Sequence, residues 1–227
     1  MKPGLVEKRL WREGYKKIAG VDEAGRGPLA GPVVAAAVIL PVFPKGALWE
    51  EVRDSKLLKY DVRERLFKAI RAEAIALSVA VSSNREIDKH NILKATLITM
   101  SKAVGRLRHQ PEMVLVDGNR SFPCPVENRC IVGGDGKILS IAAASIVAKV
   151  VRDRIMTVYA RKYPCYGFER NRGYPTREHR NALANYGACP IHRNSFRLLG
   201  DRQKQLFGKS RSSDSRLKHQ STDGERR

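Results

Sequence analysis

The sequence has few cysteines, no long apolar run and few acidic residues beside its many bases. Its four cysteines include no CxxC pair, so neither a disulfide framework nor a structural metal is expected: Cys124, Cys130, Cys165 and Cys189. No segment resembles a secretory leader, and none is apolar over enough residues to span a bilayer. We therefore expect a reduced, soluble protein of the cytoplasm with no membrane association.

Acidic residues number 23 against 43 basic ones, which gives a formal net charge of +20 and a pI near 10.2. Such an excess concentrates polyanions and speeds their capture, so nucleic acid is the expected partner. The alternative is a solvated basic surface with no specific role. With 227 residues and 42% hydrophobic content, the chain can bury a full core. We expect one domain at residues 1–208, followed by a basic, disordered tail at residues 209–227.

Apolar periodicity predicts a mixture of strands and helices. Short buried strands are indicated at residues 18–21, 32–41, 75–81 and 113–116, and helices at 5–13, 59–74, 91–107 and 142–163. A shorter helix should begin after Thr176 as its N-cap. The first two strands form a hairpin around a glycine-rich turn. This order predicts an α/β protein with a mixed β-sheet flanked by helices and a C-terminal helical segment.

Acidic residues follow three of the expected strand ends: Asp22 with Glu23, Asp117, and Asp135. Sites in such sheets form where strands end, so neighbouring strands would bring four carboxyl groups together. That cluster would repel itself and raise its own pKa values unless it bound a divalent cation, and all-oxygen ligands favour Mg²⁺ or Mn²⁺ over zinc. Two ions about 4 Å apart could activate a water and stabilise the leaving oxygen in phosphodiester hydrolysis.

Each acid also has a simpler interpretation. Asp117-Gly118 and Asp135-Gly136 are ordinary turn signals when taken singly. Adjacent residues on a regular strand point to opposite faces. Asp22 and Glu23 can therefore share a site only if the strand ends there, or if Glu23 contributes its backbone carbonyl. Asp153, four residues after Lys149, is expected to form a surface ion pair.

Residues 20–34, GVDEAGRGPLAGPVV, resemble the signature of the type 2 ribonucleases H, and of ribonuclease HII in particular. Further blocks that resemble the family follow in the family's order: Asp54-Ser55-Lys56, Val116-Asp117-Gly118, Gly134-Asp135, residues 142–154, Gly173-Tyr174, Thr176, His179 and residues 190–196. The resemblance covers roughly residues 17–197. An ordered set of motifs is far more specific than a single glycine pattern.

The resemblance implies a ribonuclease H-like fold and an endonuclease that cuts the RNA strand of RNA/DNA hybrids or incises 5′ of ribonucleotides embedded in duplex DNA. Its products would carry 3′-hydroxyl and 5′-phosphate ends, and its cofactors would be two Mg²⁺ or Mn²⁺ ions. By resemblance, Asp22, Glu23, Asp117 and Asp135 are the catalytic, metal-binding acids. The turn Gly25-Arg26-Gly27 matches the element that senses the ribose 2′-hydroxyl through its backbone. Tyr174 matches the aromatic residue that packs on the adjacent sugar.

Lys56, Ser145 and Lys149 are the expected phosphate contacts, and the last two lie one helical turn apart. Two alternatives stay open: Lys56 as a solvated loop cation, and Lys149 as the partner of Asp153. Residues 190–196 are interpreted as a structural clasp with Phe196 in the core.

A non-enzymatic nucleic-acid binder would explain the charge equally well, but carboxylates facing a phosphate backbone would weaken simple binding. A DNA-cutting nuclease of the same fold is disfavoured by the glycine-arginine-glycine turn together with Tyr174. A type HIII enzyme would carry an extra N-terminal domain, which we do not expect before the first strand. A monomeric enzyme of the HII type is therefore the favoured hypothesis.

Overall fold

A computed structural model describes residues 5–52 and 58–198 of the chain. At its centre lies a mixed sheet with the strand order β3-β2-β1-β4-β5. The strands are β1 (Ile18–Ala24), β2 (Val33–Ile39), β3 (Ala76–Ser82), β4 (Met113–Asp117) and β5 (Asn128–Ile131). Strand β2 pairs antiparallel with β1 and β3, whereas β4 pairs in parallel with β1 and β5. The predicted hairpin and mixed sheet are confirmed.

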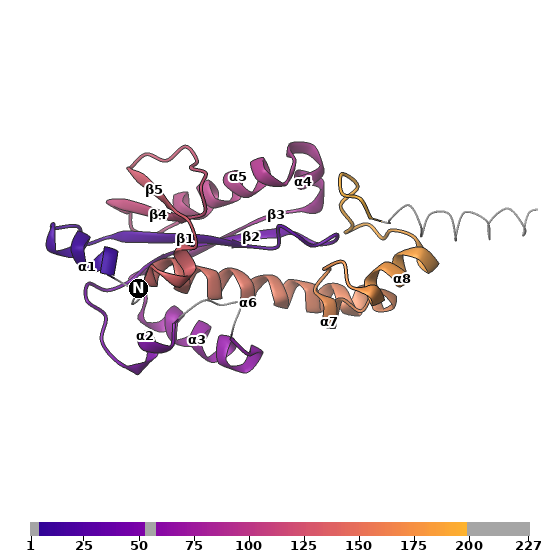
Figure 1. Cartoon of the computed structure of the whole chain (residues 1–227), viewed down its shortest axis with the longest axis horizontal. Coiled ribbons are helices and arrows are strands. Elements are labelled where there is room, and N and C mark those ends of the chain that lie inside the picture. The colour runs from indigo at the N-terminus through magenta and orange to yellow at the C-terminus, as the bar shows by residue number, and fades with distance from the viewer. Residues whose placement is uncertain (1–4, 53–57, 199–227) are drawn as a thin grey trace, which may run out of the picture.

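Helices cover both faces of the sheet (Figure 1). On one face lie α4 (Asn84–His90) and α5 (Ile92–Gly105), and on the other lie α2 (Ala47–Glu51), α3 (Tyr60–Glu73) and α6 (Leu139–Lys162). Helix α1 (Leu5–Arg12) lies at one end of the molecule, with α7 (Phe168–Asn171) and α8 (Arg177–Tyr186) at the other. Short 3-10 turns occupy Gly134–Gly136 and Pro164–Tyr166. None of the helices described is long and apolar enough to cross a membrane.

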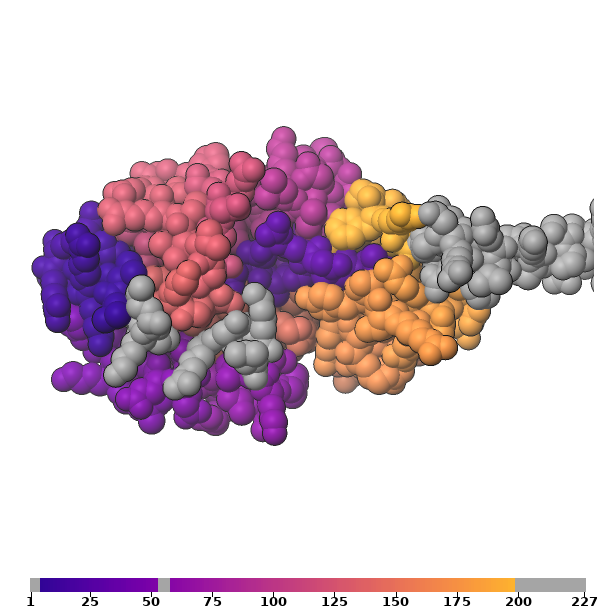
Figure 2. All heavy atoms as spheres, viewed as in Figure 1, coloured from indigo at the N-terminus to yellow at the C-terminus, as the bar shows by residue number. Residues whose placement is uncertain are grey.

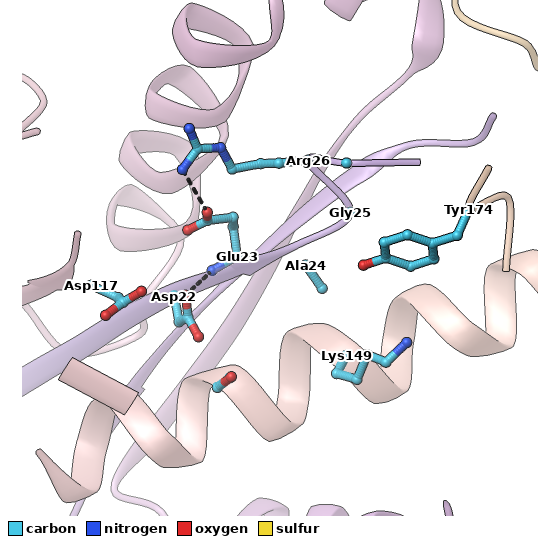
Figure 3. A pocket seen from close by; sticks show the side chains of 10 residues that line it. Asp22, Glu23, Ala24, Gly25, Arg26, Asp117, Lys149 and Tyr174 are labelled. Atoms are coloured by element: carbon cyan, nitrogen blue, oxygen red, sulfur yellow. Dashed lines mark hydrogen bonds and ion pairs between the residues drawn. The ribbon is translucent and has the colours of Figure 1, made fainter. Parts of the chain in front are cut away.

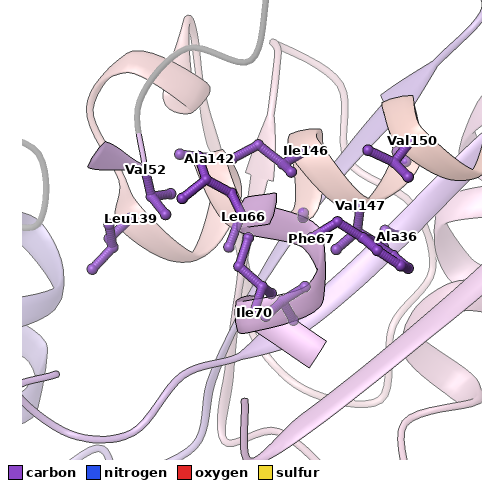
Figure 4. Close-up of a cluster of buried hydrophobic side chains, with 14 of the residues drawn as sticks. Ala36, Val52, Leu66, Phe67, Ile70, Leu139, Ala142, Ile146, Val147 and Val150 are labelled. Atoms are coloured by element: carbon purple, nitrogen blue, oxygen red, sulfur yellow. The ribbon is translucent and has the colours of Figure 1, made fainter. Parts of the chain in front are cut away.

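Strand β2 is buried along its whole length because helices cover both of its faces. Val34, Ala36 and Val38 pack toward α3 and α6, in a cluster that includes Leu66 and Ile70 (Figure 4). The alternate residues Ala35, Ala37 and Ile39 pack toward α5. This alternation gives the sheet two apolar faces, as expected for the predicted central strand.

Helix α6 packs closely on β1 because Gly20 has no side chain. A Cβ atom at Gly20 would lie 2.1 Å from the carbonyl carbon of Ser140. The helix begins at Leu139, earlier than the predicted residue 142, and the buried Glu7 of α1 accepts hydrogen bonds of 2.8 Å from the N–H groups of Leu139 and Ser140. The sequence pattern missed this start because the group that satisfies the helix end comes from another element.

Several boundaries differ from the prediction for physical reasons. Strand β1 continues to Ala24 instead of ending at residue 21, because its pairing with β2 extends to Val34. The short helices α2, α4 and α7 were not predicted, since segments of four to seven residues carry little periodic signal. The strand expected before Asp135 is β5, which ends at Ile131. The predicted tail at residues 209–227 lies outside the described residues, as do Asp54, Ser55 and Lys56.

Candidate active site

One pocket is lined by acidic residues from the ends of two neighbouring strands, β1 and β4. Val21 of β1 is in register with Val116 of β4, so Asp22 and Asp117 follow side by side. Asp22 shares a face of β1 with Gly20 and therefore points toward α6 (Figure 3). The side chain of Ser145, on α6, forms a hydrogen bond with the Asp22 carboxyl group. Asp22 is only 4% exposed.

Glu23 lies on the opposite face of β1 from Asp22 (Figure 3). Its carboxylate accepts a 3.3 Å hydrogen bond from Nη1 of Arg26, while its backbone N–H donates to Oδ1 of Asp22 at 2.7 Å. Both side chains line the pocket although the strand is regular at this point. The strand ends at Ala24, one residue after Glu23, so the expectation that the strand is ending at these two residues agrees with the structure.

Repulsion and burial act together on these carboxyl groups. Burial raises the pKa of Asp22 well above its usual range, and the neighbouring charges of Glu23 and Asp117 raise it further. Burial also raises the pKa of Glu23, with Arg26 acting in the opposite direction. A pocket whose acids are destabilised as anions favours a bound cation, and carboxylate oxygens suit Mg²⁺ or Mn²⁺. The residues present thus fit a divalent metal.

The carboxyl groups do not form a preassembled metal cluster. Across residues 5–52 and 58–198, no three His, Cys, Asp or Glu side chains are grouped so that they could hold an ion. The opposite directions of Asp22 and Glu23, and the hydrogen bond from Arg26 to Glu23, account for this separation. The predicted convergence of four carboxyl groups is therefore incomplete.

Asp135 lies beside the pocket and is not one of the residues that line it. Strand β5 ends at Ile131, and Asp135 follows on the 3-10 turn, where it is 5% exposed. The preceding residue, Gly134, donates its N–H to Oδ1 of Asp117 at 2.6 Å. Asp135 is thus one residue removed from a direct contact with Asp117.

The turn Gly25-Arg26-Gly27 forms the next part of the pocket wall. Gly25 has φ +100°, a conformation that favours glycine. Its carbonyl oxygen and that of Arg26 accept hydrogen bonds from the buried guanidinium group of Arg193, which sequence reasoning had not assigned to the site. No local sequence signal could have found this residue, because its partners lie more than 160 positions earlier in the chain.

Ser145 and Lys149 of α6 line the pocket one helical turn apart, as predicted. The Lys149 ammonium also forms a 2.7 Å ion pair with Asp153, which is 3% exposed, so the predicted surface ion pair is buried. A second cation, Arg63, lies 3.8 Å from the other oxygen of Asp153. Burial lowers the pKa of Lys149, while Asp153 raises it. Lys149 therefore combines a place in the pocket with the ion pair proposed as its alternative.

Tyr174 borders the pocket on the side away from the acidic residues, and it is 41% exposed (Figure 3). A Cβ at Gly27 would lie 3.6 Å from Cε1 of Tyr174, so the turn and the ring are close neighbours. The carbonyl oxygen of Tyr174 is 2.9 Å from Nδ1 of His179. The predicted aromatic residue is thus next to the predicted glycine turn.

The clasp expected at residues 190–196 is present, but its apolar anchor differs. Phe196 is half-buried at the edge of two apolar clusters and not in the core, because its ring covers the guanidinium group of Arg193 at 5.0 Å. The buried residues are Ile191, His192 and Arg193. His192 lies 3.0 Å from His179 between their Nε2 atoms.

Comparison with known proteins places these features in a family. The family model described as ribonuclease HII matches residues 19–199. The chain belongs to the ribonuclease HII family. It is therefore an enzyme, a hydrolase that acts as an endonuclease. The predicted family and fold are confirmed.

Three relatives illustrate the similarity. The ribonuclease HII of Syntrophus aciditrophicus (strain SB) is 50% identical over 200 residues, which are 88% of this chain and 93% of that protein. The ribonuclease HII of Granulibacter bethesdensis is 53% identical over 198 residues, 86% of this chain and 90% of that protein. The crystal structure of ribonuclease H2 from Pyrococcus horikoshii OT3 has a TM-score of 0.71 at 28% identity, covering 85% of this chain and 99% of that one.

Proposed function

We propose that this enzyme hydrolyses the RNA strand of RNA/DNA hybrids and incises 5′ of single ribonucleotides embedded in duplex DNA, leaving 3′-hydroxyl and 5′-phosphate ends. The observation that carries the proposal is the composition of one pocket, in which three strand-end carboxylates face a glycine-arginine-glycine turn and a tyrosine. Membership of the ribonuclease HII family supports the same substrate class.

Asp22, Glu23, Asp117 and Asp135 would hold divalent cations, Mg²⁺ or Mn²⁺, with two ions in the reactive complex. The raised pKa of Asp22 supports this assignment, because a nearby cation favours the ionised form of a buried carboxyl group. When bound, the cations would activate water and stabilise negative charge at the scissile phosphate. Ser145 would keep the Asp22 carboxylate oriented through their hydrogen bond.

The remaining residues of the pocket would bind the nucleic acid. Backbone N–H groups of the turn at residues 25–27 would contact the ribose 2′-hydroxyl, which is the group that distinguishes RNA from DNA. The ring of Tyr174 would pack on the neighbouring sugar, and Lys149, held by Asp153, would contact a phosphate. The net charge of +20 would provide affinity for the backbone that does not depend on sequence.

A cleavage assay tests the proposal directly. A labelled DNA duplex with one ribonucleotide, a continuous RNA/DNA hybrid and an all-DNA duplex would each be incubated with Mg²⁺, with Mn²⁺ and with a chelator. We expect metal-dependent incision 5′ of the single ribonucleotide, cleavage within the hybrid, and no cleavage of DNA. Asp22→Asn protein purified in parallel controls for contaminating nucleases. Failure to cut either ribose-containing substrate would overturn the proposal.

A further inference from the structure

Two arginines of this chain are fully buried beside the turn at residues 25–27. Arg152 of α6 and Arg193 of the clasp are each 0% exposed. Within residues 5–52 and 58–198, neither forms an ion pair with a carboxylate. Burying a charged group is unfavourable unless hydrogen bonds compensate for its lost hydration. The hydrogen-bond partners of these two guanidinium groups should therefore show which part of the structure the arginines stabilise.

Among the described residues, every hydrogen bond of these two guanidinium groups ends on a backbone carbonyl oxygen near the turn. Arg193 donates to the carbonyls of Gly25 (2.5 Å), Arg26 (2.9 Å), Gly31 (3.0 Å) and Pro32 (3.3 Å). Arg152 donates to those of Pro32 (3.0 Å), Ala30 (3.2 Å) and Arg172 (3.0 Å). Only a planar guanidinium group can donate to this many acceptors in fixed directions.

The direction of the carbonyls fixes the direction of the amide groups. In a trans peptide unit the N–H of the next residue points away from the carbonyl oxygen. When Arg193 holds the oxygens of Gly25 and Arg26, the N–H groups of Arg26 and Gly27 are turned away from the buried side. Among the described residues, the hydrogen bonds to the backbone of residues 25–27 are all accepted by carbonyl oxygens, and none is donated by an N–H group of the turn. Residues 25–27 line the pocket and Arg193 does not, so the carbonyl side that Arg193 binds is turned from the pocket and the amide side is left to face it.

The same arginines connect the turn to the rest of the site. A Cβ at Gly25 would lie 2.1 Å from Nε of Arg152, so the turn packs directly on that side chain. The guanidinium carbon of Arg152 is also 5.9 Å from the centre of the Tyr174 ring. The turn, the tyrosine and α6 therefore meet at one buried guanidinium group.

The clasp that carries Arg193 is itself anchored on two sides. The N–H of Arg193 donates to the carbonyl of Leu29, and the N–H of Gly31 donates to that of Ile191. On the other side, Asp88 of α4 accepts hydrogen bonds from the backbone N–H groups of Asn194 and Ser195 at 3.0 and 2.9 Å. Figure 2 shows this yellow C-terminal segment bordering the indigo part of the chain.

We propose that Arg152 and Arg193 are positioning residues for recognition of the ribose 2′-hydroxyl: they hold the carbonyl side of the turn so that its N–H groups face the pocket. This inference rests on the proposed function. It assigns specificity to two residues that do not line the pocket and so need not contact the substrate. If the planar guanidinium group is replaced by a single ammonium group, the charge is retained, but the N–H groups of the turn should no longer be held in one direction.

The test compares Arg193→Lys with a control variant, Leu66→Ala. The lysine keeps the charge but donates from a single point, whereas Leu66 lies in the apolar cluster of α3 and α6 and does not line the pocket. The first measurement is hydrogen exchange of peptides that span residues 24–32. The second is the ratio of cleavage rates for duplexes that differ only in 2′-hydroxyl or 2′-fluoro at one nucleotide. A reduced fraction of folded enzyme lowers both rates equally and leaves this ratio unchanged.

We expect Arg193→Lys to speed exchange of the Leu29 and Gly31 amides of this peptide, whose hydrogen bonds hold the segment that follows the turn, and to lower the ratio about tenfold, the effect of losing one or two hydrogen bonds. Leu66→Ala should leave both unchanged relative to wild type. Unchanged exchange of this peptide, or an unchanged ratio, in Arg193→Lys would overturn the inference. The wild-type enzyme tests the proposed function separately, because equal rates on its two duplexes would contradict 2′-hydroxyl recognition itself.

If Arg193→Lys does not fold, the wild-type enzyme still decides the question by NMR in the presence of chelator. The inference then predicts slow exchange of the Nε–H groups of Arg152 and Arg193. It also predicts that the amides of Arg26 and Gly27 exchange quickly and become protected only when the ribonucleotide duplex is added. Amides of the turn that are already protected in the free enzyme would contradict it.

Discussion

The two sides of the pocket are held in place by different interactions. The acidic side, Asp22, Glu23 and Asp117, is positioned by the pairing of β1 with β2 and β4. The recognition side, the turn at residues 25–27 with Tyr174, is positioned by side chains of residues 152, 179 and 193. Backbone pairing tolerates changes of side chain, whereas a hydrogen bond from a side chain is lost with it. Substitutions on the acidic side should therefore change rates alone, and substitutions on the recognition side should change selectivity.

The largest effect is expected from Asp22→Asn. Cleavage should fall by at least about a thousandfold, because cation-stabilised charge in the transition state is worth several kcal/mol. Affinity for a ribonucleotide duplex should change little, since the basic surface provides it. Unfolding temperature should rise, because the raised pKa of Asp22 marks an anion that destabilises the fold.

Asp61→Asn, at an exposed position of α3, is the matched control and should leave cleavage unchanged. Cleavage rates, binding by fluorescence anisotropy and thermal unfolding would be measured for both variants. A normal cleavage rate in Asp22→Asn would show that the acidic side does not perform the reaction.

Gly25→Ala should damage the recognition side through its packing. The methyl group would lie 2.1 Å from Nε of Arg152, at a residue with φ +100°. We expect a loss of about 1–3 kcal/mol of unfolding free energy from the strained backbone alone, and reduced selectivity for the 2′-hydroxyl. Gly105→Ala, where an added Cβ meets nothing within 4 Å, should be neutral or stabilising. Urea unfolding of both variants checks this, and equal stabilities would mean that the turn does not pack as described.

Tyr174→Ala should change selectivity with little change in stability, because the ring is 41% exposed. Stacking on an aromatic ring is worth about 1–3 kcal/mol, so incision at a single embedded ribonucleotide should fall about tenfold more than cleavage of a continuous hybrid. Tyr174→Phe keeps the ring and should retain most of the ratio. Equal losses of Tyr174→Ala on both substrates would refute its role at the junction.

The smallest expected effect is the loss of folding stability at acidic pH that His192, in the clasp at residues 190–196, should cause. The N–H of Cys189 donates to Nδ1 of His192 at 2.9 Å, so the proton of His192 resides on Nε2 and is donated to His179. His179 in turn donates from Nδ1 to the carbonyl of Tyr174. Protonation of either ring would place two N–H groups against each other. Burial, with His179 as a secondary cause, lowers the pKa of His192 to about 4.

The unfolded chain takes up a proton on His192 near pH 6.5, whereas the folded enzyme does so only near pH 4. Stability should therefore be full above about pH 6.5 and fall as the pH drops toward 4, by about 1 kcal/mol between about pH 7 and pH 5.5. His192→Asn should lose this dependence, and the exposed His109→Gln should keep it. Urea unfolding at several pH values measures the slope, and a wild-type slope that His192→Asn retains would contradict the assignment.

The contrast between the two sides also explains what the sequence could predict. Asp22 and Asp117 were predictable because each follows an apolar run that forms a strand, and strand ends meet at one edge. Arg193 was not, because its four acceptors are carbonyl oxygens more than 160 residues earlier, and carbonyls carry no side-chain signature. The same limit applies to Glu7, which completes the start of α6 from 132 residues away.

Two residues differ in burial from the sequence-based prediction, again because of contacts made in the tertiary structure. Phe196 was predicted in the core as part of the clasp at residues 190–196, but it covers the guanidinium group of Arg193 and remains half-exposed. Asp153 was predicted to form a surface ion pair because it lies four residues after Lys149, yet it is buried against Lys149 and Arg63. In both cases a cation contacted in the tertiary structure, Arg193 for Phe196 and Arg63 for Asp153, contributes to the environment of the residue.

The most direct test of the account compares Asp117→Asn with Tyr174→Ala on two substrates, a single embedded ribonucleotide and a continuous hybrid, under single-turnover conditions. If the acidic side performs the reaction and the recognition side selects the substrate, Asp117→Asn lowers both rates by the same factor. Tyr174→Ala then changes their ratio. A changed ratio in Asp117→Asn, together with an unchanged ratio in Tyr174→Ala, would contradict the division of the pocket into two sides.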